Sequence, residues 1–158
     1  MIEKKFEQLE KWQQDLLLKA EGIMENAYNV YSNYHVGCAI LAKDIKMFLG
    51  TFAENSSYGA TICAERAALL NANTNGERIL KAIAVIGRHK NFDSLDPVTP
   101  CGLCRQFISE FAHISDYDIE LICSNTKKDK IYLTTINELL PYAFGPKDLN
   151  MDLSKFRR

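Results

Sequence analysis

The chain has 158 residues, which suffices for one domain with a buried core. Its 19 basic and 20 acidic residues leave a net charge of −1, and this balance disfavours a nucleic-acid partner, whose phosphates bind mainly clustered lysine and arginine. The first twenty residues are charged throughout, unlike a secretory signal, and no apolar run approaches the roughly 20 residues that cross a bilayer, so we expect a cytoplasmic protein without a membrane segment.

The predicted elements alternate between helix and strand. Apolar residues at steps of three, four and seven predict an amphipathic helix over residues 3–27, and the interruption of its stripe at Gln13 marks residues 1–14 as an N-terminal helical extension. The remaining elements are strands at 36–42 and 46–53, a helix at 63–72, a buried strand at 80–87, a helix at 101–113, strands at 119–124 and 130–134, and a short helix at 136–140. Because a helix between strands usually packs on the sheet, this order predicts a single domain over residues 1–158, a three-layer α/β/α sandwich with a mixed five-stranded sheet.

Two cysteines separated by two residues open one of these helices, in the segment TPCGLCRQF. Thr99 followed by Pro100 fits an N-cap with proline at the first helical position, which places Cys101 and Cys104 on one face of the first turn. The partial positive charge of a helix N-terminus favours thiolates there, as a redox pair and a zinc site both require. The spacing alone leaves these two interpretations open, with buried structural cysteines as a third.

A third cysteine, in the segment TICAERAALL, favours the metal site. A redox pair does not need Cys63, whereas a catalytic zinc takes three protein ligands and keeps a fourth position for water. Glu65 can serve as a proton carrier that is not a ligand, provided that Cys63 occupies the irregular first position of its helix. Arg66 shares a helix face with Cys63 and can balance the negative charge of the thiolates. Cys38 and Cys123 fall in predicted strands and are expected to be buried apolar side chains.

The combination of C-A-E at one helix start and P-C-x-x-C at another, with a buried strand between them, is the three-cysteine pattern of zinc deaminases. From about Asp15 to Leu149 the chain resembles the small homotetrameric type of cytidine deaminase, in the segments YSNYHVG, ENSSYG, TICAERAAL, PCGLCRQF and LLPYAFGPKDL. The resemblance implies a hydrolase that acts on the C–N bond of a cyclic amidine. Cytidine or deoxycytidine would give uridine or deoxyuridine and ammonia, in pyrimidine salvage.

The resemblance also implies the metal site. One zinc ion per subunit would be bound by Cys63, Cys101 and Cys104. Glu65 would be the catalytic acid and base, and Arg66 would lie beside the metal ligands. The expected partners are a small-molecule nucleoside and further copies of the chain in a homotetramer, with no nucleic acid and no membrane.

The implied nucleoside pocket departs from the family at one position. Tyr34, Glu54 and the backbone of Ala64 would contact the nucleoside, and Phe144 would stack on the base in the site of a neighbouring subunit. The family normally has an asparagine two residues before the pocket glutamate, where TFAEN places Phe52. A phenyl ring cannot hydrogen-bond a ribose hydroxyl, so a modified or differently sugared cytosine nucleoside is the alternative substrate, unless Phe52 turns into the core and Glu54 suffices. A thiol oxidoreductase built on the C-x-x-C pair is a less favoured alternative.

Overall fold

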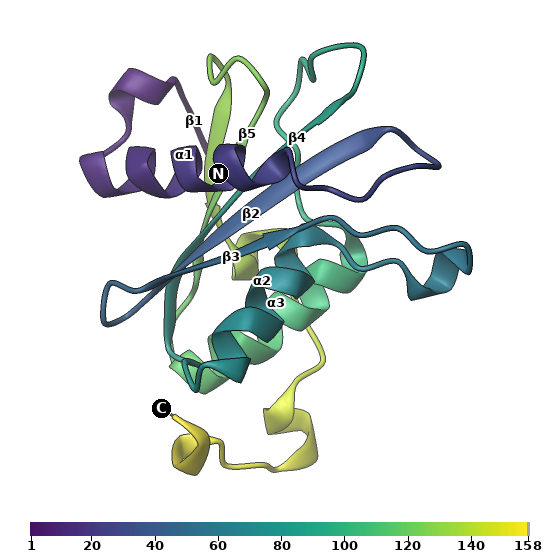
Figure 1. The fold of residues 1–158 in the computed structure, drawn as a ribbon. Helices are drawn as coiled ribbons and strands as arrows, with labels where there is room; N and C mark the ends of the chain where they lie inside the picture. The colour runs from purple at the N-terminus through teal and green to yellow at the C-terminus, as the bar shows by residue number, and fades with distance from the viewer. Residues whose placement is uncertain (158) are drawn as a thin grey trace.

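The architecture is a mixed β-sheet covered on both faces by helices (Figure 1). A computed structural model describes residues 1–157. Within this range, six strands form one sheet in the order β1-β6-β5-β4-β2-β3, in which β4 and β5 run parallel and the other neighbours antiparallel. The strands are β1 (Ile2–Lys4), β2 (Tyr34–Ala42), β3 (Met47–Thr51), β4 (Leu80–His89), β5 (Glu120–Ser124) and β6 (Ile131–Thr135). The helices are α1 (Lys11–Met24), α2 (Ala64–Thr74), α3 (Gly102–Ser115) and α4 (Ile136–Leu139), with 3₁₀ turns at Phe6–Gln8, Tyr58–Ala60, Pro146–Leu149 and Ser154–Phe156.

The alternation of side chains along the central strands divides the core into two parts. On β2, Cys38 and Ile40 face the layer that contains α2 and α3, whereas Ala39 and Leu41 face α1 on the other side. Strand β4 is buried on both faces, as its continuous apolar sequence predicts. The three-layer α/β/α arrangement expected from the sequence is therefore confirmed.

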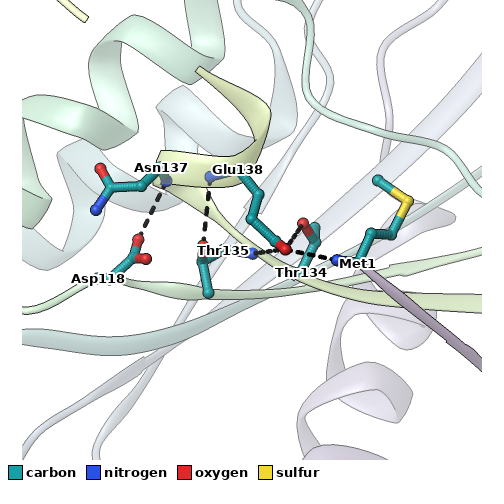
Figure 2. A network of polar contacts seen from close by, with 6 residues as sticks. All are labelled: Met1, Asp118, Thr134, Thr135, Asn137 and Glu138. Atoms are coloured by element: carbon teal, nitrogen blue, oxygen red, sulfur yellow. Dashed lines mark hydrogen bonds and ion pairs between the residues drawn. The ribbon is translucent and has the colours of Figure 1, made fainter. Parts of the chain in front are cut away.

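The sheet has six strands rather than the five expected, because the N-terminal residues add a strand at its edge. Residues Ile2–Lys4 pair with β6, and the ammonium group of Met1 donates to the Glu138 carboxylate at 2.6 Å (Figure 2). The same carboxylate accepts hydrogen bonds from Thr134 Oγ1 and from the Thr135 backbone N–H. These contacts tie the chain terminus to the start of α4 and cover the edge of β6, whose backbone groups would otherwise be free to pair with another chain.

The long helix expected over residues 3–27 is shorter and begins at Lys11. A strand and a 3₁₀ turn precede it, so the extension over residues 1–14 is helical only in its last turn. Gln13 interrupts the apolar stripe because it marks the helix start: its side chain accepts from the Glu10 N–H at 2.9 Å and donates to a carboxylate of β5. No helix among residues 1–157 is both long and apolar enough to span a membrane.

Two glycines let helices lie directly against opposite faces of the sheet. A Cβ atom at Gly50 of β3 would lie 2.2 Å from the Ala68 nitrogen and 2.5 Å from the Ala64 oxygen, both backbone atoms of α2. A Cβ atom at Gly37 of β2 would lie 2.0 Å from the Ala20 oxygen of α1. A side chain at either position therefore requires the helix to move, and α2 is the helix whose start carries a predicted metal ligand.

Gly50→Ala is expected to push α2 away from the sheet. The free energy of unfolding should fall by about 1–3 kcal/mol, as overpacking of a core does, and the metal ligand at the start of α2 should be displaced. Thermal unfolding and the zinc content of the purified variant measure the two effects. Gly37→Ala is the matched control, which should lose similar stability and keep its zinc because α1 lies on the other face. Equal zinc loss in both variants would contradict the prediction.

Candidate active site

The first predicted ligand lies at the start of α2. Cys63 is the N-cap residue and has extended backbone angles (φ −70°, ψ 152°). Its side chain therefore does not follow the helical spacing, which is the condition for Cys63 and Glu65 to face the same site. Glu65 follows in the first turn and is only 4% exposed. The free N–H groups of this turn carry partial positive charge, which favours a thiolate at Cys63.

The other two predicted ligands lie at the start of α3. Cys101 is the N-cap residue (φ −67°, ψ 167°), so the N-cap predicted at Thr99 is wrong by two residues. Nε of Arg105 donates a 2.7 Å hydrogen bond to the Pro100 carbonyl, and Nη1 donates to the Leu139 carbonyl at 3.1 Å, so this side chain holds the segment before Cys101 against α4 and outside the helix. Cys104 lies in the first turn and is buried, whereas Cys101 is exposed.

The three cysteines form one group. The Sγ atoms of Cys63, Cys101 and Cys104 all lie within 4.8 Å of one another. Sulfurs placed tetrahedrally at a Zn–S distance of about 2.3 Å are about 3.8 Å apart, so this group fits one zinc ion. Among residues 1–157 the group contains three ligand side chains and no fourth, which is the arrangement of a catalytic zinc site with one open position.

Arg66 supplies positive charge beside this group. Its Nη2 donates to the Thr61 carbonyl at 2.7 Å, and the positive charge of its guanidinium group favours the Cys63 thiolate. Its Nε is buried and has no hydrogen-bond partner among the described residues. A negatively charged group of thiolates and metal would offset this buried positive charge, so the donor set and its surroundings both fit zinc.

The sulfurs and the carboxylate influence one another's protonation. Hydrogen bonds with Cys104 and Arg66 lower the pKa of Cys63 to about 5. The same contact with Cys63, together with burial, raises the pKa of Cys104, because a second negative charge beside the first is unfavourable without a cation. Burial raises the pKa of Glu65, and the Cys63 thiolate adds to the effect. A carboxyl group with a raised pKa holds a proton more readily than a solvent-exposed glutamate, which suits a residue that takes up and passes on a proton.

The segment predicted to bind the nucleoside runs alongside the segment that leads into Cys63. Ala53 and Ile62 exchange two backbone hydrogen bonds, at 3.0 and 2.9 Å, which places residues 52–54 beside the start of α2. Ala64, the first residue of α2, is fully buried. Its backbone N–H has no acceptor within the helix, because it belongs to the first turn. The structure therefore brings three of the predicted substrate residues, Phe52, Glu54 and Ala64, to the same end of the sheet as the cysteines.

Glu54 is held by a turn of the preceding loop. Its carboxylate accepts hydrogen bonds from the backbone N–H groups of Tyr31 (2.8 Å) and Ser32 (3.2 Å). Desolvation opposes the charge, but the hydrogen bonds from Ser32 and Tyr31 outweigh it and lower the pKa of Glu54. The side chain borders a cavity of about 370 Å³, lined also by Tyr31, Ser32, Asn55, Tyr58 and Thr61. Glu54 is therefore an ionised acceptor at the edge of an open pocket.

Tyr34 is oriented by a residue that the sequence analysis did not single out. Its hydroxyl lies 3.2 Å from Ser94 Oγ, and the Ser94 hydroxyl donates its only proton to the Gly87 carbonyl at 2.9 Å. Tyr34 is therefore the donor in the shared hydrogen bond, which leaves its lone pairs as acceptors. Ser94 lies in a polar loop without any pattern, so the sequence contains no signal for this role.

Phe52 does not turn into the core. Its ring is half-buried and belongs to neither core cluster of the described residues. Phe52 follows the last residue of β3, and its N–H donates to the Val36 carbonyl of β2 at 3.1 Å. The ring is thus outside the apolar core, at the end of β3 that leads to the segment beside the start of α2.

Phe144 lies apart from the pocket of its own chain. The residue is 62% exposed, and its carbonyl accepts a 2.9 Å hydrogen bond from Gln106 Nε2 on the outer side of α3. It borders a different cavity of about 360 Å³, lined also by Glu110, Pro146 and Leu149. An aromatic ring exposed in this way is available for contact with another molecule.

This fold, with a three-cysteine group beside a buried glutamate, defines a zinc deaminase of the α/β class. The profile of the cytidine and deoxycytidylate deaminase zinc-binding region matches residues 10–118, and the chain belongs to this family. Cytidine deaminases from Sporosarcina psychrophila and Halalkalibacterium halodurans are each 42% identical to it, over 85% and 87% of this chain and 93% and 97% of theirs. The crystal structure of cytidine deaminase from Burkholderia pseudomallei matches with a TM-score of 0.74 and 39% identity, over 82% of this chain and 97% of that chain.

Replacement of any one of Cys63, Cys101 and Cys104 by serine is expected to reduce the zinc content of the purified protein from about one ion per chain to near zero, because each removes one of three thiolates. Elemental analysis after dialysis against a mild chelator measures the loss. Cys123→Ala is the control, since Cys123 is fully buried in β5 outside the group and burial raises its pKa to about 12. Full zinc content in a serine variant would remove that cysteine from the ligand set.

Proposed function

We propose that the protein catalyses the zinc-dependent hydrolysis of cytidine or deoxycytidine to uridine or deoxyuridine and ammonia. The observation that carries this proposal is the meeting of three sulfurs within 4.8 Å beside the buried carboxyl group of Glu65. Membership of the deaminase family and the relatives named cytidine deaminase support the substrate class. A redox enzyme built on Cys101 and Cys104 is less well supported, because it leaves Cys63 and Glu65 without a role.

The proposed chemistry divides between the metal and the chain. A zinc ion held by Cys63, Cys101 and Cys104 supplies a Lewis acid that makes a water molecule nucleophilic at neutral pH. Glu65 takes a proton from the attacking water and gives it to N3 of the base as the new C4–O bond forms. It then takes the second proton from the new C4 hydroxyl and transfers it to the amino group as the C4–N bond breaks, which leaves the C4 carbonyl. One water is consumed and one ammonia is released, and Glu65 returns to its starting state.

The remaining residues bind and orient the nucleoside. The Ala64 backbone is proposed to contact the pyrimidine edge at the start of α2, and Glu54 to accept a hydrogen bond from a ribose hydroxyl. Tyr34 would pack beside the sugar and base, with its hydroxyl oriented by Ser94. Arg66 would offset the charge of the thiolates. Holding the base against the metal in this way lowers the barrier by removing the entropy cost of bringing the reactants together.

We further propose a homotetramer with shared sites, in the cytoplasm. The exposed ring of Phe144 supports the sharing, because it is free to cover the base in a neighbouring subunit and exclude water there. Three thiolate ligands support a reducing compartment, in which cysteines stay available to a metal. A single zinc per subunit follows from the single group of three sulfurs among residues 1–157. Pyrimidine salvage is the corresponding metabolic role.

The position of Phe52 keeps a modified or differently sugared cytosine nucleoside as the second candidate substrate. If the ring faces the sugar, Phe52→Asn should raise kcat/KM for cytidine about tenfold, since one hydrogen bond contributes roughly 1–1.5 kcal/mol. Loss of the ultraviolet absorbance of the cytosine ring measures turnover of cytidine, deoxycytidine and free cytosine by both proteins. Free cytosine is the control, because it has no sugar. An equal change for cytidine and cytosine would show that Phe52 does not act on the sugar.

Glu65→Gln should retain zinc and lower kcat by about 10²- to 10⁴-fold, since the amide keeps the shape of the side chain and removes its proton transfer. Elemental analysis and the same ultraviolet assay separate the two effects. If kcat survived the substitution, another group would be the proton carrier.

A mixture of two inactive variants tests the sharing of sites. Glu65→Gln and Phe144→Ala chains, denatured and refolded together, should form some sites that combine an intact Glu65 with an intact Phe144 from a neighbour. Activity above the sum of the separately refolded variants is expected. Purely additive activity would show that Phe144 does not act on a neighbouring site.

A further inference from the structure

Each N-cap cysteine of the metal group is followed by an arginine that reaches back over the helix start. Arg66 Nη2 donates to the Thr61 carbonyl and Arg105 Nε donates to the Pro100 carbonyl, both at 2.7 Å and both across five residues of chain. The positive charge of Arg66 favours the Cys63 thiolate, so this arginine has an electrostatic role in the site. Arg105 contacts carbonyl groups instead, so its role needs a different explanation.

Arg105 joins two segments that are far apart in the sequence. Besides the Pro100 carbonyl, its guanidinium group donates to the Leu139 carbonyl from Nη1 at 3.1 Å, and Nη2 lies 3.5 Å from Thr99 Oγ1. Leu139 is the last residue of α4, and its carbonyl has no acceptor role within that helix. A planar guanidinium fork can hold two carbonyls in fixed directions at once, which a lysine ammonium group cannot do in the same geometry.

Through the Pro100 carbonyl, the Arg105 guanidinium group can affect the position of the metal ligand Cys101. This carbonyl belongs to the peptide bond that enters Cys101, so its direction sets the rotation of the Cys101 backbone. Cys101 lies outside the helical path, is exposed, and makes no side-chain capping hydrogen bond. Its orientation therefore depends on the segment before it, and Arg105 is the side chain that fixes that segment.

The Leu139 carbonyl, the second acceptor of Arg105, belongs to a helix that is held in place by several hydrogen bonds. At the start of α4, Glu138 and Thr135 bond each other's backbone N–H groups, and the Asn137 N–H donates to Asp118 at 3.1 Å (Figure 2). The Met1 ammonium group binds the same Glu138 carboxylate. The carbonyl at the far end of this short helix is thus a rigid acceptor for Arg105.

We propose that Arg105 is a positioning residue of the metal centre, which orients Cys101 by clamping the Pro100 carbonyl against the end of α4. The proposal rests on zinc binding by Cys63, Cys101 and Cys104. Positioning residues around metal ligands commonly change metal affinity 10- to 100-fold when they are replaced. Arg105 does not contact the ligand sulfurs or the pocket. Its replacement should therefore change the binding of zinc more than the binding of substrate.

Arg105→Lys tests the proposal, because it keeps the charge and removes the fork. The rate of zinc release to a chromophoric chelator should rise about 10- to 100-fold, and the sulfur-to-metal absorption of the cobalt-substituted protein should shift or broaden. Arg78→Lys is the matched control: Arg78 also donates from Nε, at 2.7 Å and across five residues, but to the side chain of Asn73 in the last turn of α2. Circular dichroism of both variants confirms that the compared samples are folded.

Faster zinc release and an altered cobalt spectrum in Arg105→Lys alone would support the proposal. Wild-type release rates in Arg105→Lys, or an equal acceleration in Arg78→Lys, would overturn it. If Arg105→Lys does not fold, Arg105→Gln is measured in the same way, since glutamine can bond one carbonyl but not both. Wild-type protein that binds zinc and lacks turnover would refute the proposed reaction and leave this test intact.

Discussion

The site depends on two parallel helices that begin at the same end of the sheet. Strand β4 is joined to α2 before it and to α3 after it, and β5 continues parallel to β4. Both helices therefore run opposite to β4 and pack beside each other on one face of the sheet (Figure 1). Their first turns meet at the carboxyl end of β4, where ligands of open α/β sheets usually bind. Cysteines at the two N-cap positions can then reach one metal.

This meeting of helix starts also creates the electrostatic character of the site. Two N-termini and Arg66 bring positive charge to one place, which thiolates and a buried carboxyl group can balance. Without a cation, the second thiolate is disfavoured beside the first, as the raised pKa of Cys104 indicates. Cys38 of β2 and Cys123 of β5, both fully buried as the sequence predicts, lie on either side of Val85 of β4 and contribute to the apolar surroundings of Glu65. The charges around Cys63, Cys101 and Cys104 therefore favour a bound metal ion between the three sulfurs.

The sequence alone predicted the chemistry better than the edges of the fold. The spacing of cysteines and the position of Glu65 led to a metal group that the structure assembles, because metal ligands restrict residue type strongly. The strand at residues 2–4 was missed, since three residues that stay largely at the surface have no periodicity and the Met1 terminus beside them is held by the distant Glu138. The N-cap of α3 was placed two residues early because Thr99 and Pro100 resemble a cap. Arg105 holds the Pro100 carbonyl and the distant Leu139 carbonyl at once, and this tertiary contact with α4 leaves no sequence pattern.

X-ray absorption spectroscopy of the zinc-loaded protein measures whether all three cysteines bind one zinc ion. Three cysteines at two helix starts should give three sulfur ligands at about 2.3 Å and one lighter atom at about 2.0 Å. That result would show that α2 and α3 share one metal with an open position. A site of four sulfurs, or of nitrogen and oxygen atoms with fewer than three sulfurs, would contradict the account.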